Sequence, residues 1–246
     1  MENCKKVCLS LSGGLDSTML LMYYLSRGFE VRAYSFDYGQ KHDIELRKLR
    51  DNIDFLQHIK LPVTHQIINL RDAFSDSASS LYGANNEKIP EGHYKDENMK
   101  STVVENRNVI FSSIIYGKAL GWANKTQSNV LISLGIHAGD HTIYPDTTPE
   151  SQAMARELFR ISNWGSERVD YEAPFVNLHK HELLQTGINA MKSLGFKQDE
   201  IEFVLEHTHS CYNPDEYRRS CGKCGTCVER LEAFEKIGLK DPIEYI

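Results

Sequence analysis

An eight-residue run near the amino terminus combines hydroxyl, glycine and acidic residues in an order suited to binding an anion. It consists of Ser10, Leu11, Ser12, Gly13, Gly14, Leu15, Asp16 and Ser17. An apolar run at 7–11 leads into it and an amphipathic helical pattern follows, so we expect strand, tight turn and helix. Glycines let the backbone approach a ligand closely, and a helix begins with free N–H groups at the positive end of its dipole. Such a corner binds phosphate.

The spacing of this run distinguishes it from two other phosphate loops. A Walker loop requires Gly-x-x-x-x-Gly-Lys-Ser/Thr and a dinucleotide fingerprint requires Gly-x-Gly-x-x-Gly, and this run has neither pattern. Ser-Gly-Gly-x-Asp-Ser instead resembles the pyrophosphate loop of enzymes that cleave ATP between its α and β phosphates. Such enzymes transfer AMP to an oxygen and release pyrophosphate. An ordinary strand-to-helix turn with an Asp or Ser cap is the structural alternative.

Four cysteines near the carboxyl end form a second group with recognisable chemistry. Their pattern is C-x9-C-x2-C-x2-C, at Cys211, Cys221, Cys224 and Cys227. Two intervening residues allow a turn to bring both sulfurs onto one ion at roughly 2.3 Å. Four thiolates form a closed, tetrahedral, structural zinc site, which would fix a segment too small to bury its own core. Four metal-free thiols are the alternative, and the spacing does not exclude an iron–sulfur role.

The composition indicates a globular protein and argues against some functional classes. The chain has 246 residues, 41% of them hydrophobic and 25% charged, and a net charge of −6. An acidic balance argues against a dedicated nucleic-acid-binding protein. The amino-terminal residues lack the apolar segment of a signal peptide, and no run of eighteen apolar residues occurs. We therefore expect a cytoplasmic protein without a membrane segment, in which cysteines are thiols or metal ligands.

Alternating apolar strands and amphipathic helices must position these two groups. We expect strands at 7–11, 31–36, 64–70, 130–134 and 169–175, and helices at 16–26, 42–58, 106–122, 150–161 and 180–194. The alternation predicts an α/β fold with a doubly wound, mostly parallel sheet and helices on both faces. Ligands bind such sheets at the carboxyl ends of the strands.

One long irregular stretch interrupts this alternation. Residues 71–105 are rich in Ser, Asn, Glu and Gly, and we interpret 71–106 as an active-site lid, with a flexible surface insertion as the alternative. We expect an ATP-binding α/β domain at 1–175 that contains this lid. A helical carboxyl-terminal subdomain at 176–246 would carry the cysteines.

The loop and the cysteines together resemble the QueC family, the 7-cyano-7-deazaguanine synthases of the PP-loop ATP pyrophosphatase superfamily. Further motifs match in order, namely Asp37-Tyr38-Gly39-Gln40-Lys41-His42, Arg107-Asn108, Asp140 with Tyr144-Pro145-Asp146, Ala173-Pro174-Phe175 with Lys180, and Thr208-His209-Ser210-Cys211-Tyr212. The resemblance spans about residues 6–235. It implies a Rossmann-like fold of the adenine nucleotide α-hydrolase type with a zinc-binding helical subdomain at the carboxyl end.

The resemblance also implies a reaction. The family converts 7-carboxy-7-deazaguanine, ammonia and ATP into the nitrile 7-cyano-7-deazaguanine (preQ0), a precursor of queuosine, through an acyl adenylate and an amide. ATP, Mg²⁺ and a structural Zn²⁺ are the implied cofactors. The nitrogen source would be free ammonia or the amine of a partner, and a homodimer is typical of the family.

The resemblance assigns roles to single residues. The ATP-binding set comprises Ser10, Leu11, Ser12, Gly13, Gly14, Leu15, Asp16, Ser17, Asp37, Tyr38, Gln40 and His42. The substrate-binding set comprises Arg107, Asn108, Asp140, Tyr144 and Asp146, and the catalytic candidates are Asp16, Arg107, Asp140 and Lys180. Carboxylates would hold Mg²⁺ or the guanine-type edge, and the two cations would steady phosphate or carboxylate charge. Each residue has a structural alternative as a helix, turn or cap residue.

Two departures from the family pattern leave the product open. The family usually reads Pro-Gly-Arg-Asn where this chain has Glu105-Asn106-Arg107-Asn108, and Tyr-Pro-Asp-Cys-Arg where Thr147-Thr148 follow Asp146. A cationic side chain near the substrate is therefore missing. A QueC-like ligase that joins the deazaguanine acid to a protein or other amine, as in paralogues of antiviral gene sets, is the first alternative. An RNA-thiolating PP-loop enzyme and a non-catalytic nucleotide sensor are further alternatives, the former disfavoured by the acidic chain.

Overall fold

The computed structural model describes residues 5–41, 44–93 and 97–246, with the backbone alone at 141 and 142. His42 of the predicted ATP-binding set lies outside the described residues. Within them, no helix has both the length and the apolarity needed to cross a membrane.

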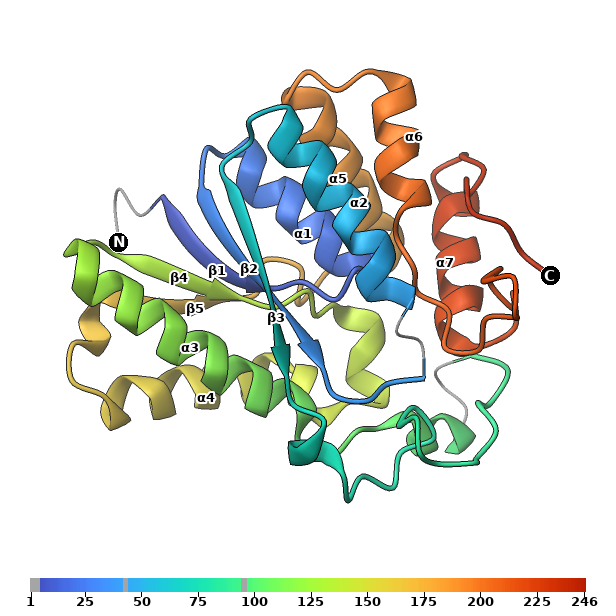
Figure 1. Ribbon diagram of the computed structural model, residues 1–246, viewed down its shortest axis with the longest axis horizontal. Helices are drawn as coiled ribbons and strands as arrows, with labels where there is room; N and C mark the ends of the chain where they lie inside the picture. Colours follow the sequence, from blue (N-terminus) through green and yellow to red (C-terminus); the bar gives the residue numbers. More distant parts are fainter. Residues whose placement is uncertain (1–4, 42–43, 94–96) are drawn as a thin grey trace.

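Five parallel strands form one sheet at the centre of the molecule (Figure 1). They are β1 (Lys6–Ser10), β2 (Glu30–Asp37), β3 (Val63–Asn69), β4 (Val130–Ser133) and β5 (Val169–Glu172), in the spatial order β3-β2-β1-β4-β5. Every pairing is parallel. The chain winds outward from β1 on one side to β3 and on the other from β4 to β5. The carboxyl ends of β1 and β4 are therefore the topological switch point at which such sheets bind ligands.

Helices cover both faces of this sheet, as the sequence predicts for an α/β fold. They are α1 (Leu15–Ser26), α2 (Ile44–His58), α3 (Arg107–Thr126), α4 (Pro149–Ser162), α5 (Lys180–Ser193), α6 (Gln198–Glu206) and α7 (Gly225–Lys236). α1, α2 and α5 lie on one face and α3 and α4 on the other (Figure 1). The two faces bury separate apolar clusters because each central strand alternates its side chains between them. The predicted doubly wound sheet is confirmed.

A close contact between α1 and α5 joins the start of the chain to its carboxyl-terminal part. Gly187 lies in the middle of α5, and a Cβ at this position would overlap Met19 of α1. Glycine weakens a helix interior, so this close approach accounts for its presence. Both helices contribute to one apolar cluster although residue 175 was the predicted domain boundary. The boundary itself stays a prediction.

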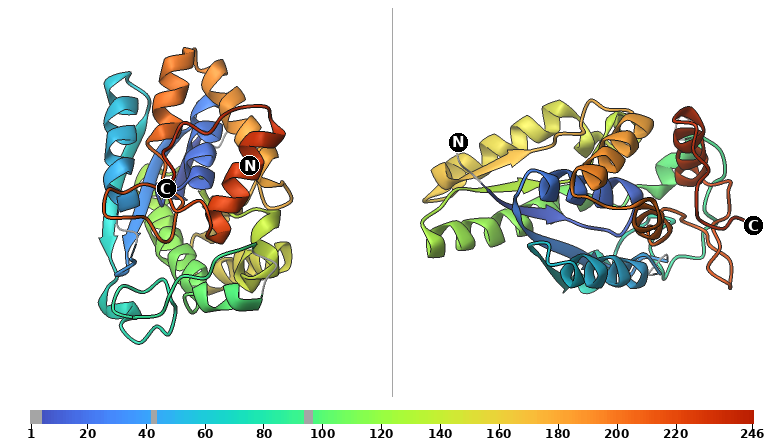
Figure 2. Two further views of the ribbon diagram at one scale, coloured as in Figure 1. Left: turned by 90° about the vertical axis from the view of Figure 1, so that its right-hand side faces the viewer. Right: turned by 90° about the horizontal axis from the view of Figure 1, so that it is seen from above.

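The predicted lid, residues 71–106, contains two short 3₁₀ helices, at Asp72–Phe74 and Glu97–Thr102. It lies at the same end of the molecule as α7, beyond the carboxyl ends of the strands (Figures 1 and 2). Gly83 N donates to Gly39 O at 2.6 Å, and Gly92 N donates to Lys223 O at 2.9 Å. The segment is thus paired with the turn after β2 and with the cysteine-containing loop. Whether it opens and closes stays a prediction.

Candidate functional site

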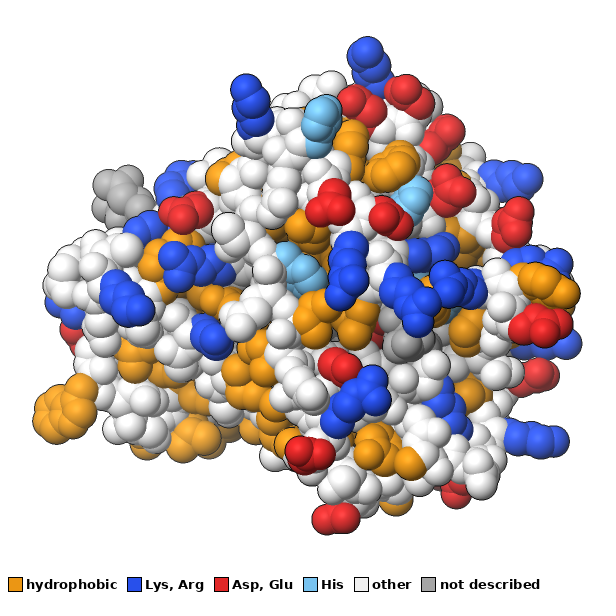
Figure 3. Space-filling model, viewed as in Figure 1, with side chains coloured by type: hydrophobic (Ala, Val, Ile, Leu, Met, Phe, Trp, Pro, Cys, Tyr) orange, Lys and Arg blue, Asp and Glu red, His pale blue; other side chains and the backbone are white. Residues whose placement is uncertain are grey.

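A cavity of about 180 Å³ opens at the carboxyl ends of β1 and β4. Most of the predicted phosphate loop lines it, together with Tyr38, Arg107, Asp140, Tyr144 and Lys180. The β2, α3 and α5 segments thus meet the loop at the switch point of the sheet. The face of the molecule seen in Figure 3 carries Lys and Arg side chains beside Asp and Glu rather than one continuous basic surface.

The glycine corner has a backbone that only glycine fits. Gly13 has a φ of +94°, and a Cβ there would lie 2.5 Å from Glu45 O. Its own carbonyl accepts the His209 N–H at 2.9 Å, so the corner is held by a segment far along the chain. α1 then begins at Leu15 without a side-chain cap from Gly14. An uncapped helix start behind a glycine turn is a phosphate-binding geometry.

Hydroxyl groups of the loop form a local network around this corner. Ser17 Oγ lies 3.1 Å from Ser12 Oγ and accepts the Ser12 N–H at 3.2 Å. Gly14 N donates to Ser12 Oγ at 3.1 Å, and Leu15 N donates to Ser210 Oγ at 3.4 Å. These bonds fix the loop while its hydroxyls remain on the cavity wall, where they can reach an anion.

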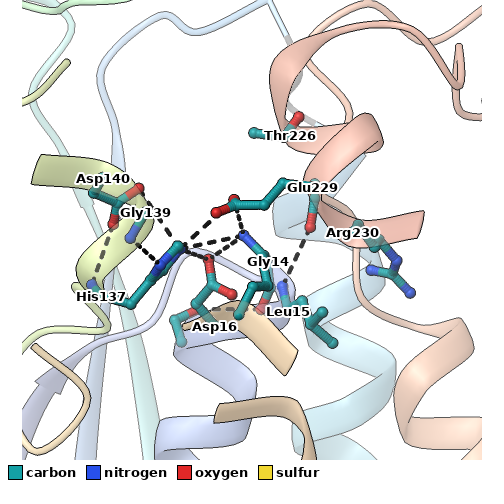
Figure 4. Close-up of polar contacts among 12 residues, drawn as sticks. Gly14, Leu15, Asp16, His137, Gly139, Asp140, Thr226, Glu229 and Arg230 are labelled. Carbon is teal, nitrogen blue, oxygen red and sulfur yellow. Dashed lines mark hydrogen bonds and ion pairs between the residues drawn. The ribbon is translucent and has the colours of Figure 1, made fainter. Parts of the chain in front are cut away.

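Charged side chains from four segments converge beside the loop (Figure 4). Lys180 Nζ lies 2.8 Å from Asp16 Oδ2 and 3.1 Å from Glu229 Oε2. His137 Nε2 lies 3.5 Å from Asp16 Oδ2, 3.7 Å from Asp140 Oδ1 and 3.8 Å from Glu229 Oε2. The structure therefore brings three predicted residues together and adds His137 and Glu229.

Burial and charge act in opposite directions on this cluster. Burial alone would raise the pKa of the Asp16 carboxyl, but the charges of Lys180 and His137 outweigh it and hold that pKa below its usual range. Burial alone would lower the pKa of the Lys180 amine, but Asp16, Glu229 and Asp140 raise it above its usual range. Burial raises the pKa of Asp140. Asp16 and Lys180 are thus ionised at neutral pH.

Asp16 has a free oxygen suited to a hard cation. Its Oδ2 pairs with Lys180, whereas its buried Oδ1 has no hydrogen-bond partner among the described residues. A buried acceptor without a partner is costly unless a ligand supplies one. Carboxylate oxygen is the ligand type that Mg²⁺ prefers. The donor set therefore fits Mg²⁺ bound together with phosphate oxygens.

Arg107 begins α3 and brings a cation into the cavity without a carboxylate partner. Its guanidinium contacts Tyr38 OH at 3.5 Å and Asn108 Oδ1 at 3.4 Å, and lies 5.8 Å from the ring centre of Tyr144. No carboxylate of the described chain forms an ion pair with it. A guanidinium in this setting can bind an anion through two parallel N–H groups.

Asp146 and Asn108 bind each other rather than lining the cavity as a pair. Asp146 accepts the Asn108 N–H at 3.2 Å and the Asn108 Nδ2–H at 3.1 Å. Asp146 is thus an anion at the start of α3, where the helix dipole favours it. Among the described cavity-lining residues Asn108 is present and Asp146 is not.

Asp37 and Gln40 shape the turn after β2, behind the cavity wall. Asp37 pairs with Arg71 at 2.9 Å and accepts the Gly39 N–H at 3.2 Å. The Gln40 amide donates to Phe36 O at 3.2 Å and accepts the Tyr38 N–H at 3.0 Å. In the described turn, Tyr38 lines the cavity and these two residues hold it there.

The four cysteine sulfurs meet at one point, although two of the cysteines lie in the loop before α7, one is the N-cap of α7 and one lies in its first turn. Ligand atoms of Cys211, Cys221, Cys224 and Cys227 all lie within 4.8 Å of one another, and all four residues are buried. Cys221 Sγ and Cys227 Sγ are 3.9 Å apart. A tetrahedral zinc with Zn–S bonds of about 2.3 Å requires about 3.8 Å between sulfurs. The cluster could therefore bind a metal ion, and its geometry fits zinc.

Two residues of the charged cluster, His137 and Glu229, were not predicted from the sequence. His137 lies in the irregular stretch after β4, where no periodicity or motif distinguishes it from other polar residues. Glu229 lies two residues after Cys227, on the helix that the cysteine turn begins. A carboxylate placed this close to an expected metal turn was the signal that could have found it.

Comparison with known proteins agrees with these features. A family model described as queuosine biosynthesis protein QueC matches residues 6–238. The 7-cyano-7-deazaguanine synthase of Caldicellulosiruptor saccharolyticus is 42% identical over 236 residues, which cover 96% of this chain and 93% of that protein. The synthase of Methanoregula boonei is 38% identical over 240 residues, covering 98% and 99%.

Solved structures also align with the chain, among them one with a much lower sequence identity. The alignment with NMN synthetase from Francisella tularensis covers 97% of this chain and 79% of the synthetase chain, with 13% identity and a TM-score of 0.43. The family model and the relatives span nearly the whole chain, including the glycine corner and all four cysteines. The chain therefore belongs to the QueC family of queuosine biosynthesis proteins.

Proposed function

We propose that this chain uses ATP to adenylate the carboxylate of 7-carboxy-7-deazaguanine and then replaces AMP by nitrogen from ammonia. The observation that carries the proposal is one cavity lined by the glycine corner, the Lys180–Asp16 ion pair and Arg107. A carboxylate is a poor electrophile because oxide is a poor leaving group. Transfer of AMP to its oxygen supplies a good leaving group.

The phosphates of ATP would lie against Gly13, Gly14 and the first turn of α1. Backbone N–H groups and the hydroxyls of Ser12 and Ser17 would bind them. Mg²⁺, when bound by Asp16 and phosphate oxygens, would neutralise charge on the departing pyrophosphate. Lys180 would stabilise the same charge from the side.

The substrate carboxylate would lie against Arg107. Two parallel N–H groups would hold it beside the α-phosphorus, and Tyr38 and Tyr144 would restrict the guanidinium from either side. Asp140, also on the cavity wall, would accept N–H donors of the deazaguanine ring.

The nitrile would then form in two steps, of which the first adds nitrogen and the second removes the amide oxygen. Ammonia attacks the acyl adenylate, AMP leaves, and an amide results. A second ATP transfers AMP to the amide oxygen, and loss of this AMP together with the remaining nitrogen protons gives the nitrile, 7-cyano-7-deazaguanine. Each step releases AMP and pyrophosphate, so two of each accompany one nitrile.

A ligase that stops at an amide is the alternative that a specific observation favours. Thr148 caps α4 by accepting the Ser151 N–H at 3.2 Å, and Thr147 Oγ1 donates to Tyr144 O at 2.7 Å. Neither residue brings a cation to the place where the family has arginine. A larger amine, on a protein or a small molecule, would then be the acceptor.

Product analysis tests both proposals. The purified protein is incubated with 7-carboxy-7-deazaguanine, ATP, Mg²⁺ and ammonium, and nucleotides and deazaguanines are followed by mass spectrometry. AMP with nitrile supports the synthase, AMP with amide alone supports the ligase, and ADP in place of AMP contradicts both. Asp16→Asn serves as the inactive control.

We further propose Zn²⁺ at the four cysteines and a homodimer, as the family resemblance implies.

An exposed apolar face on α4 supports the homodimer. Met154, Leu158 and Ile161 on α4 and the adjacent Trp164 are 71%, 53%, 65% and 98% exposed. Spacings of three and four residues place the first three on one face of the helix. Burial of this face against a second copy would remove it from water. Light scattering of the parent and of Leu158→Glu tests the homodimer, and metal analysis of the parent tests the zinc.

A further inference from the structure

Glu229 connects the cysteine-containing loop to the charged cluster of the cavity. Cys224 is the N-cap of α7, Cys227 lies in its first turn, and Glu229 follows on the same helix. In Figure 4 Glu229 reaches from α7 toward His137 and Asp16. Its Oε2 lies 3.1 Å from Lys180 Nζ, and its side chain is 20% exposed.

The three N–H groups of Lys180 have defined directions because two carboxylates hold it. Asp16 Oδ2 at 2.8 Å and Glu229 Oε2 at 3.1 Å each accept one of them. His137 Nε2 lies 3.4 Å from Lys180 Nζ, and it carries a proton both in the charged ring and in the neutral tautomer whose Nδ1 accepts the Gly139 N–H at 3.0 Å. It therefore does not accept an N–H of Lys180. The third N–H of Lys180 is therefore available to a ligand in the cavity, which Lys180 lines.

The backbone makes room for this arrangement at one residue. A Cβ on Gly139 would overlap Glu229 Oε1. A glycine at 139 thus lets the carboxylate lie over the turn after β4. Both oxygens of the Glu229 carboxylate are thus in close contact, Oε1 with Gly139 and Oε2 with Lys180.

We propose that Glu229 is a positioning residue for the adenylation reaction, which acts by orienting Lys180 toward the phosphates of ATP. The inference rests on the proposed function for the reaction, but the orientation of Lys180 is a property of the protein alone. Helix α7 thereby contributes to the chemistry of the cavity and not only to the stability of the fold.

Kinetics of Glu229→Gln test this role, because the variant keeps the size of the side chain and removes its charge. We expect kcat to fall about tenfold, since small misplacement of a catalytic group is costly, while KM for ATP changes less than twofold. Glu235→Gln, an exposed position on the same helix, is the matched control and should match the parent. Equal kcat values for Glu229→Gln and the parent overturn the proposal.

Two further variants separate positioning from general damage. In a Lys180→Met background, adding Glu229→Gln should change the residual rate less than twofold, because the residue through which Glu229 acts is gone. A further tenfold loss would contradict the proposal. Gly139→Ala keeps every charge, but its Cβ would overlap the Glu229 carboxylate and lie 2.7 Å from His137 Cε1, so it should lower kcat at least as much as Glu229→Gln.

The reactivity of the Lys180 amine tests the positioning role of Glu229 without a catalytic assay. The rate at which an amine-reactive reagent labels Lys180 is measured by peptide mass spectrometry in the parent, Glu229→Gln and Glu235→Gln. Lys180 is 6% exposed, and we expect labelling at least fivefold faster in Glu229→Gln alone. Unchanged labelling overturns the proposal. A parent that labels as expected but forms no AMP overturns the proposed function instead.

Discussion

The glycine corner and the cysteine cluster contain similarly small, polar residues, but only the corner leaves polar atoms available. At the corner, Asp16 Oδ1 is buried without a partner in the described chain, and the hydroxyls line a cavity. At the cluster, four buried sulfurs face one another within 4.8 Å, which leaves no open position. An open set of donors suits catalysis and a closed set suits structure.

Cys224→Ser is expected to have the largest effect and tests whether the cysteine cluster is a closed metal site. Removal of one ligand from a closed site should release the metal, and structural zinc sites contribute on the order of 10 kcal/mol at neutral pH. We expect loss of bound metal and a lower thermal midpoint, measured by metal analysis and calorimetry. Cys8→Ser, in β1, is the control that keeps all four ligands. A stable, metal-containing Cys224→Ser protein would refute the closed site.

Asp16→Asn tests the open site. The amide removes a charge that binds Lys180 and an oxygen suited to Mg²⁺, so pyrophosphate release should fall by about 10²–10³-fold. The thermal midpoint should change far less than in Cys224→Ser. Comparable loss of stability in both variants would show that the two regions do not differ as described.

Gly13→Ala examines the backbone of the corner. The new Cβ would lie 2.5 Å from Glu45 O, at a φ of +94°, so we expect a loss of about 2–3 kcal/mol of stability and weaker ATP binding by calorimetry. Gly28→Ala has a φ of +75° and no atom within 4 Å of the new Cβ. This control measures the φ strain alone. Equal effects of the two substitutions would rule out a steric requirement at Gly13.

The smallest expected effect is a pH dependence of stability that arises from His65 in β3, away from both regions. Burial, with a contribution from Arg50, lowers the pKa of His65 to about 4. In the unfolded state the pKa of His65 is near 6.5, so between about pH 6.5 and 4 the unfolded state binds more protons than the folded state. Stability therefore falls as pH drops through this range. Because His65 is partly exposed, we expect about 1–2 kcal/mol less stability at pH 5 than at pH 7.

Urea unfolding at pH 7 and pH 5 measures this difference in the parent and in His65→Gln. The variant should lose correspondingly less stability on acidification. His58→Gln, at the exposed end of α2, is the control and should behave like the parent. An equal acid response in the parent and in His65→Gln would exclude this source of pH dependence.

Local patterns predicted most of the fold and the two motifs. Apolar runs and helical periodicity gave the five strands, and the glycine corner and the cysteines were recognisable because their chemistry depends on short spacings. The ends of the elements were predicted less accurately. The last strand was expected to reach residue 175 but β5 ends at Glu172, and the third helix was expected to end at 122 but α3 extends to Thr126. The periodic apolar signal fades where an element leaves the core.

Contacts between distant segments could not be predicted in this way. The pairing of Glu229 with Lys180 joins residues 49 positions apart, and the sequence near each gives no indication of the other. The pairing of Asp146 with Asn108 shows the same limit, because it joins residues 38 positions apart, and the place of Asp146 in the substrate-binding set stays a prediction. Strand order, which decides such neighbours, is a property of the whole sheet.

The hydrogen bond from His209 to Gly13 has a consequence for biosynthesis of the chain. The two residues are 196 positions apart, and the bond supports the backbone of the corner. During translation the amino-terminal strands and helices leave the ribosome long before residue 209 is made. A nascent chain shortened before that point therefore lacks one support of the glycine corner, which is complete only after the last quarter of the polypeptide has folded back onto the first.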